Sequence, residues 1–162
     1  MKKQFFCVAA IVFSIFILVS VVLAASPEKD ADGVRVAAEA FYSALNTMFT
    51  GEMGPMKEVW SHKDDVTYMG PAGGFRSGWK QVLADWETQA ALKLGGKVEP
   101  KEMRITVGHD LAFVSNYEIG QNVSADGKPQ AVTIRATNLF RKESGNWKMI
   151  GHHTDILPFL QK

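Results

Sequence analysis

His153 and Asp155 are the two residues whose types and spacing best suit chemistry in this sequence. An imidazole titrates near neutral pH, and a nearby carboxylate can orient it and stabilise its charged form. The pair could therefore transfer protons or hold the polar group of a ligand. The alternative is a hydrogen-bonded pair at a strand end near a dimer face, because residues two apart on a strand point the same way without having to touch.

The strand that must position this pair belongs to a predicted β-hairpin. Apolar-rich runs at 133–141 and 147–154 flank Glu-Ser-Gly-Asn at 143–146, residue types that reverse a chain between paired strands. Because side chains alternate along a strand, one face of the second run is predicted to carry Trp147, Met149, Gly151, His153 and Asp155. On the first run, the same alternation separates Arg135, Thr137 and Leu139 from Ala136, Asn138 and Phe140. We expect these strands to direct His153 into a hollow beneath a bent sheet.

Three further polar residues precede this hairpin or begin it. Arg135 could hold an anionic ligand through its planar guanidinium, or form an ion pair with Glu118 or Asp155. Asn116 and Glu118 share one face of the preceding predicted strand. Glu118 is a candidate base if that face is concave, but the pattern favours a solvated outer face.

Aromatic residues are numerous enough to line an apolar pocket, in which two tyrosines would supply hydroxyl groups. The candidates for such a lining are Trp60, Tyr68, Phe75, Trp79 and Tyr117. A plain hydrophobic core is the alternative, and it is favoured for Trp86. The histidines and carboxylates have no recognisable metal-ligand spacing, and the glycine-rich segment 70–74 lacks the lysine and helix start of a phosphate-binding loop. We therefore predict no metal and no cofactor.

Length and composition point to one folded domain. The chain has 162 residues, of which 46% are hydrophobic and 22% are charged, which is typical of a globular protein rather than a disordered one. Lys2 and Lys3 are two of its 18 basic residues, so the remainder carries 16 against 17 acidic ones, a net charge of about -1. No basic stripe is available to neutralise phosphates, which argues against a nucleic-acid partner.

The first residues resemble an export signal. Lys2 and Lys3 precede an apolar run over 5–25, and Val22-Leu23-Ala24 suits a signal peptidase, so we predict a signal peptide at 1–24 with cleavage after Ala24. The run is also long enough to serve as an uncleaved membrane anchor. Either way the domain is predicted to be exported, periplasmic or secreted. The single cysteine, Cys7, lies in this run, so the exported domain would have no disulfide.

The rest of the chain is predicted to hold helices first and strands later. A linker is predicted at 25–32, one folded domain at 33–157 and a tail at 158–162. Apolar residues at three- and four-residue intervals predict a helix from about Gly33 to Gly51, and shorter helices follow Gly54 and Gly78. Strands are predicted at 66–69, 97–107, 111–123, 130–141 and 147–154. This order predicts an α+β fold with three N-terminal helices on a curved antiparallel sheet.

This arrangement resembles the nuclear transport factor 2-like superfamily, especially its SnoaL-like members, over roughly 34–155. It is also similar to the association domain of calcium/calmodulin-dependent protein kinase II. Three local sequences carry the resemblance: Gly78-Trp79 at a helix start, Gly108-His109-Asp110-Leu111-Ala112 at a strand turn, and Arg135-Ala136-Thr137 followed by Gly145-Asn146-Trp147 and His153. The resemblance implies a cone-shaped fold around a pocket and a homodimer formed through the sheet. Many relatives end in His-x-His-x-Ser; here Gly151, His153 and Asp155 occupy those positions, which weakens a ligand role at the first.

Three functions remain open from the sequence. The first is an exported SnoaL-like domain that binds a small, largely apolar molecule, with Trp60, Tyr68, Phe75, Trp79, Tyr117, Arg135, His153 and Asp155 as its site. The second is a proton-transfer enzyme of the isomerase, dehydratase or cyclase type, with His153 or Asp155 as base and Tyr68 or Tyr117 as donor to an oxyanion. The third is a non-catalytic dimerisation or partner-binding module. Fold alone does not decide among them.

Overall fold

The computed structural model describes residues 27–124 and 126–156. Its elements follow in chain order: α1 (Pro27–Met48), α2 (Gly54–Val59), β1 (Thr67–Met69), β2 (Arg76–Ser77), α3 (Trp79–Ala91), β3 (Lys97–Val107), β4 (Leu111–Val123), β5 (Pro129–Glu143) and β6 (Asn146–Asp155). The predicted signal peptide and tail lie outside the described residues. Within 27–124 and 126–156, no helix is both long and apolar enough to span a membrane.

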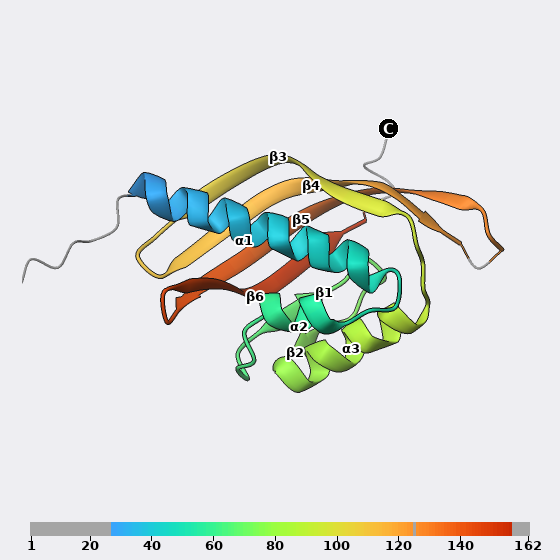
Figure 1. Cartoon of the computed structure of the whole chain (residues 1–162), viewed down its shortest axis with the longest axis horizontal. Coiled ribbons are helices and arrows are strands. Elements are labelled where there is room, and N and C mark those ends of the chain that lie inside the picture. The colour runs from blue at the N-terminus through green and yellow to red at the C-terminus, as the bar shows by residue number, and fades with distance from the viewer. Residues whose placement is uncertain (1–26, 125, 157–162) are drawn as a thin grey trace, which may run out of the picture.

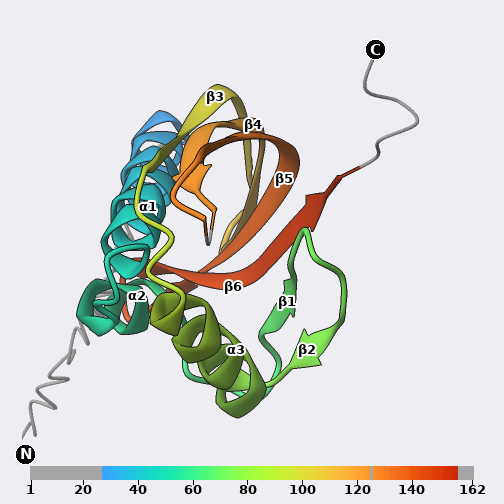
Figure 2. The same cartoon turned by 90° about the vertical axis from the view of Figure 1, so that its right-hand side faces the viewer.

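One curved sheet organises the molecule. Its strands are hydrogen-bonded in the order β2-β1-β6-β5-β4-β3. The long α1 helix lies along one face of this sheet, α2 packs against α1, and α3 lies beside the short strands β1 and β2 (Figures 1 and 2). We call the face that packs on α1 the inner face and the opposite face the outer face. The predicted α+β architecture is therefore confirmed.

The structure differs from the predicted fold in three details. The sheet is mixed, because β1 pairs with β6 in parallel whereas all other pairs are antiparallel. The two-residue strand β2 was not predicted, since a strand that short has no readable periodicity. The first helix begins at Pro27, so most of the predicted linker is helical; proline is well tolerated in a first turn, where its missing N–H has no intrahelical partner anyway.

The apolar stripe of α1 forms one wall of the core. Val34, Ala38, Phe41 and Met48 are fully buried there, at the three- and four-residue spacing that the sequence predicted. They pack in one cluster with side chains from α2, α3 and the sheet, including Met56, Trp60, Trp86, Val114, Phe140 and Met149. Each large apolar side chain buried in this way contributes about 1.5–3 kcal/mol to folding.

The predicted hairpin is confirmed, with an irregularity that the alternation pattern did not include. Ser144 and Gly145 form its two-residue turn, both with positive φ angles of 49° and 85°, which is typical of tight hairpins. Further along, Leu139 pairs with Gly151 but Phe140 pairs with Met149, so Ile150 is an extra residue in β6. Such a β-bulge shifts the side-chain alternation by one position. Met149 and His152 are consequently both buried on the inner face, and His153 is on the outer face.

Candidate functional site

Five polar side chains meet between α1 and the inner face of the sheet: Tyr42, Asn116, Glu118, Asn138 and His152. We call them the interior polar cluster. All five are buried, with exposed fractions between 0% and 7%. They come from four elements, since α1 supplies the tyrosine, β4 two residues, and β5 and β6 one each. Buried polar groups are costly unless they are hydrogen-bonded, so the contacts among the five decide whether the cluster is stable.

Tyr42 is the centre of this network. Its hydroxyl accepts hydrogen bonds from the side-chain amides of Asn116 (2.8 Å) and Asn138 (3.1 Å), and donates one to Oε1 of Glu118 (3.1 Å). One turn later on α1, the side chain of Asn46 bonds both the N–H and the C=O of Val98 on β3, at 2.8 and 2.9 Å. This double contact fastens α1 to the edge of the sheet, and so holds the phenol above β4 and β5.

His152 and Glu118 form the ionisable part of the cluster. Nδ1 of His152 lies 2.6 Å from Oδ1 of Asn138, while its Nε2 lies 3.5 Å from Oε1 of Glu118. Burial raises the pKa of Glu118 from 4.5 to about 7, and it lowers the pKa of His152 from 6.5 to about 3. Near neutral pH the imidazole is therefore uncharged and the carboxyl group is poised to exchange a proton, which is the condition that general acid–base chemistry requires.

Aromatic rings surround this pair. The imidazole of His152 lies 4.8 Å from the ring of Phe41, and 5.8 Å from the nearly parallel ring of Tyr68. Trp86 lies 6.0 Å away on a third side. Its indole N–H is buried and, among the described residues, has no hydrogen-bond partner; the same holds for Trp60. The imidazole is thus enclosed by packed aromatic rings of the core.

A pocket of about 360 Å³ opens on the inner face beside this cluster. Its walls come from the long β4–β5 hairpin, the loop after β1 and the end of β6; they include Asn122, Val132, Ile134, Pro71 and Ile156. Ile134 is the direct cross-strand partner of Glu118. Since directly opposite side chains on one face are neighbours, Ile134 lies between this pocket and Glu118, which does not itself line the pocket.

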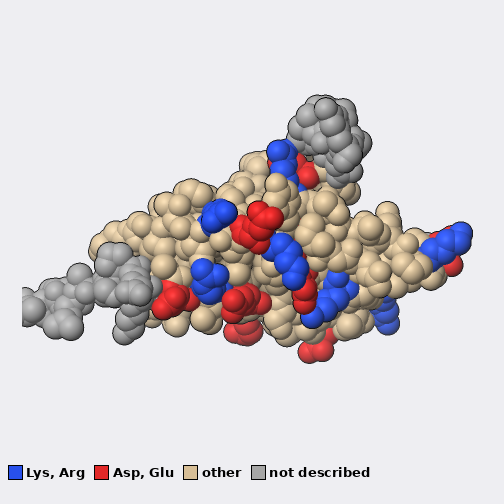
Figure 3. Space-filling model, turned by 90° about the horizontal axis from the view of Figure 1, so that it is seen from above, with Lys and Arg blue, Asp and Glu red and all other residues tan. Residues whose placement is uncertain are grey.

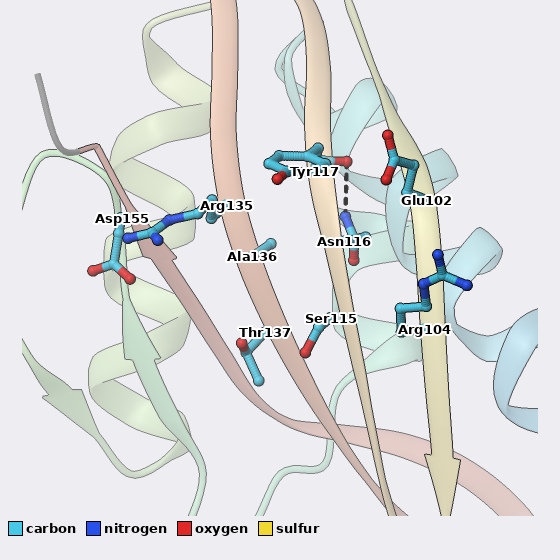
Figure 4. Close-up of a pocket in the computed structure, with 9 residues that line it drawn as sticks. All are labelled: Glu102, Arg104, Ser115, Asn116, Tyr117, Arg135, Ala136, Thr137 and Asp155. Carbon is cyan, nitrogen blue, oxygen red and sulfur yellow. Dashed lines mark hydrogen bonds between the residues drawn. The ribbon is translucent and has the colours of Figure 1, made fainter. Parts of the chain in front are cut away.

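A second hollow, of about 500 Å³, lies on the outer face (Figure 4). Figure 4 shows its charged residues at two sides, with Glu102 and Arg104 on β3 and the pair Arg135 and Asp155 on β5 and β6. Tyr117 lies between them, with 43% of its surface exposed. Glu102 has a positive φ of 56° where β3 bulges, which re-aims the side chains on this edge. We call this hollow the outer groove.

The residues predicted as a site are divided between the two faces. Tyr117, Arg135 and Asp155 line the outer groove, and His153 lies on the same face, hydrogen-bonded to Oγ1 of Thr67 at 3.0 Å. Burial lowers the pKa of His153. The expectation that His153 and Asp155 point into the interior is wrong, because the bulge at Ile150 exchanges the faces of the strand end. An ion pair between Arg135 and Glu118 is excluded, because Arg135 lies on the outer face of β5 and Glu118 on the inner face of β4.

The predicted aromatic residues are also separated. Trp60 and Tyr68 are buried in the core, at 1% and 4% exposure, whereas Phe75 is 60% exposed. Trp79 is half-buried and stacks on His62 with 4.4 Å between ring centres. The expectation that Trp86 belongs to the core is confirmed.

Sequence reasoning missed the interior polar cluster in three ways. It favoured a solvated face for Asn116 and Glu118, which is wrong because that face packs on α1. It put His153 rather than His152 on the same face as Met149, since a bulge has no marker in the alternation pattern. It omitted Tyr42, although this residue lies four positions after Ala38 on the predicted helix stripe. The informative signal was therefore a polar residue inside an apolar stripe.

Charge is mixed on the surface shown in Figure 3. Lysine and arginine alternate there with aspartate and glutamate, and no large area has a single sign. In β3, Glu99 forms ion pairs with Lys97 and Lys101. Within the described residues there is also no cluster of histidine, cysteine and carboxylate side chains that could hold a metal ion.

The curled sheet around α1, with a polar cluster in its interior, defines the cone-shaped nuclear transport factor 2-like fold. Residues 34–157 match the SnoaL-like domain family, and the chain belongs to this family. The resemblance predicted from the sequence is thus confirmed.

Solved structures agree on the fold. A proposed dehydratase of the nuclear transport factor 2-like family from Streptomyces avermitilis has a TM-score of 0.72 and 24% identity, covering 82% of this chain and 99% of that one. A proposed calcium/calmodulin-dependent protein kinase type II association domain from Thiobacillus denitrificans has a TM-score of 0.65 and 24% identity, covering 76% and 94%. A proposed ketosteroid isomerase from Shewanella frigidimarina has a TM-score of 0.62 and 19% identity, covering 75% and 94%.

A curated relative matches part of the chain. The F-box protein SKIP8 of Arabidopsis thaliana is 24% identical over 102 residues, which cover 63% of this chain. The match spans only 41% of the plant protein. These similarities are low, and they establish a shared fold rather than a shared reaction.

Proposed function

We propose that this domain binds a small, mainly apolar molecule in the inner-face pocket, with the molecule's polar group against the interior polar cluster. The observation that carries the proposal is the position of Ile134, which is both a wall of the 360 Å³ pocket and the cross-strand partner of Glu118. A volume of this size suits a molecule of one to three rings. The buried carboxyl group of Glu118, opposite Ile134, is the polar group that would orient such a ligand.

The test is binding of a panel of neutral one- and two-ring ketones, alcohols and phenols, measured by saturation-transfer NMR. Val132→Trp fills the inner pocket, and Val36→Trp places the same bulk on the exposed side of α1 as a matched control. We expect the wild type and Val36→Trp to bind the same panel members and Val132→Trp to bind none. Absence of binding to the wild type, or binding that survives in Val132→Trp, would contradict the proposal.

Proton transfer is a second candidate function, favoured by one observation. Glu118 has a pKa of about 7, and its Oε1 lies 3.5 Å from Nε2 of the uncharged His152. The same oxygen accepts a hydrogen bond from the hydroxyl of Tyr42. A carboxyl with this pKa can remove a proton next to a carbonyl group and return it elsewhere. In that case the wild type should accelerate deuterium uptake by 2-tetralone in D₂O, and Glu118→Gln should lose the acceleration. Binding without accelerated exchange would leave only the first function.

We also propose that a second copy of this chain packs on the outer face. β4 exposes Leu111, Phe113, Tyr117 and Ile119 there, between 37% and 52% of each surface. An exposed row of large apolar side chains is typical of an interface. Sedimentation analysis should show a dimer for the wild type and a monomer for Phe113→Lys. A monomeric wild type would refute the proposed dimer.

Export stays a prediction that rests on residues 1–24. We propose that the domain crosses a membrane and is released by cleavage after Ala24. N-terminal sequencing of the protein recovered from cells tests this directly: a mature chain that starts at Ala25 supports release, and an intact Met1 supports the anchored form.

A further inference from the structure

The outer groove is lined by charged side chains that are not bonded to one another. Glu102, Arg104, Arg135 and Asp155 surround its hollow of about 500 Å³. Among the described residues, none of the four has an ion-pair or side-chain hydrogen-bond partner. Further along β5, by contrast, Arg141 is bonded to two carboxylates. The charged groups of the groove are therefore available to a ligand.

The floor of the groove carries small hydroxyl side chains. Arg104 on β3 is the cross-strand partner of Ser115 on β4, which in turn is the partner of Thr137 on β5. These three residues form one row across the outer face, and Figure 4 shows the two hydroxyl groups between the charged walls. A guanidinium and two hydroxyl groups can all donate hydrogen bonds. This row therefore suits a carboxylate.

Charge is balanced across the groove. The β3 wall carries Glu102 and Arg104, and the opposite wall carries Arg135 on β5 and Asp155 on β6, so each wall has one charge of each sign (Figure 4). A ligand with a single charge would leave one sign of the groove unmatched, whereas a zwitterion complements both. While the donor-rich row at Arg104 suits a carboxylate, Asp155 on the far wall accepts hydrogen bonds and suits an ammonium group.

The width of the groove sets the length of such a ligand. In the sheet order, β3 and β6 are three strand spacings apart, which is about 14 Å. An extended dipeptide spans about 7 Å. It fits between the long side chain of Arg104, which reaches in from β3, and the shorter side chain of Asp155 on β6.

We propose that the outer groove binds a small zwitterion of dipeptide length, with its carboxylate on Arg104 and the adjacent hydroxyl groups and its ammonium group on Asp155. This site is separate from the inner-face pocket, whose proposed ligand is mainly apolar. Tyr117 belongs both to the groove and to the apolar row proposed as the dimer interface, so a bound ligand would lie between the two copies of that dimer. The side chains that bind it come from one copy, and a monomeric wild type would leave this inference intact.

Three matched probes separate the two ligand charges. Glycylglycine carries both, N-acetylglycine has the same skeleton without the ammonium group, and glycine methylamide has it without the carboxylate. NMR titration of ¹⁵N-labelled wild-type protein should show glycylglycine bound in the groove, with shifts at Ser115 and Thr137, and each analogue bound about tenfold more weakly. Absence of glycylglycine binding, or equal affinity for either analogue, would overturn the inference.

Two exposed positions assign the ends of the ligand. Arg104→Gln should bind glycylglycine about tenfold more weakly than the wild type does, and no better than it binds glycine methylamide. Asp155→Asn should likewise no longer distinguish glycylglycine from N-acetylglycine. Arg35→Gln, at an exposed position on α1, is the matched control and should bind all three probes as the wild type does. Wild-type affinities in Arg104→Gln or in Asp155→Asn would overturn the assignment, and neither result would affect the neutral panel in the inner pocket.

Discussion

The two faces of strands β4, β5 and β6 differ in how their polar residues are partnered, although they are built from alternate residues of the same strands. On the inner face, Asn116, Asn138 and His152 are buried and bonded to each other or to Tyr42. On the outer face, Arg135 and Asp155 line an open groove. Burial makes each inner hydrogen bond indispensable, because the lost partner cannot be replaced by water. Chemistry should therefore be sought where polar residues are enclosed, rather than where they are most numerous.

The largest effect should come from breaking the inner network at Asn138. Replacing it with leucine leaves Oδ1 of Asn116 and Nδ1 of His152 unpaired and removes one of the hydrogen bonds to Tyr42, and should reduce the free energy of unfolding by about 4 kcal/mol. Thr137→Val changes the adjacent residue on the outer face, and should cost less than about 1 kcal/mol. Urea denaturation of both variants measures the contrast. Similar losses at the two positions would show that the faces do not differ in this respect.

A pH dependence follows from the shifted pKa values of the inner pair. The stability contributed by Glu118 is full below its unfolded pKa of 4.5 and is lost as the pH rises to about 7. The contribution of His152 has the opposite sign: it is full above 6.5 and is lost as the pH falls toward 3. The two trends oppose each other between pH 4.5 and 6.5.

Removing the carboxyl group of Glu118 should therefore leave only the pH dependence of stability that His152 causes. From pH 4.5 to 6.5, the stability of Glu118→Gln should rise by about 3 kcal/mol relative to the wild type. Glu39→Gln, at an exposed position on α1, serves as the control and should follow the wild type. Urea midpoints across this range provide the measurement. A difference between Glu118→Gln and the wild type that does not change with pH would contradict the burial of this pair.

A smaller effect is expected where the outer face is closely packed. A Cβ atom on Gly151 would lie 2.7 Å from Cδ1 of Leu139, so this side chain must move to accommodate Gly151→Ala. We expect a loss of about 1 kcal/mol in stability. Adding Leu139→Ala should remove this cost, which a double-mutant cycle in urea would detect. Additive losses would show that the contact with Leu139 is not the cause.

The smallest effect is expected at Asp155, which the sequence placed in the site. Asp155→Asn changes a charge at the rim of the outer groove, and should alter the unfolding free energy by less than about 0.5 kcal/mol. Binding in the inner pocket should be unchanged. Binding that is weakened more than threefold would show that the carboxylate of Asp155 belongs to this binding site.

The sequence predicted the elements well because they have strong periodic signals. The stripe from Val34 to Met48 and the turn at Ser144-Gly145 lie where expected. It failed at the site because faces on a strand depend on register, and one extra residue, Ile150, exchanges them. Glu118 was recognised as a candidate base, but whether its face is covered depends on α1, which lies 76 residues earlier in the chain at Tyr42. The residue pattern of one strand does not show which of its faces a distant helix covers.

The neighbouring histidines on β6 allow the central claim to be tested with one matched pair of variants. Titration calorimetry with 2-naphthol should be compared for His152→Gln and His153→Gln, at a pH where both proteins are folded. We predict at least about tenfold weaker binding for His152→Gln, because the interior loses its imidazole, and a change of less than twofold for His153→Gln. The reverse result, with binding lost at His153 and retained at His152, would move the functional site to the outer face and contradict the account.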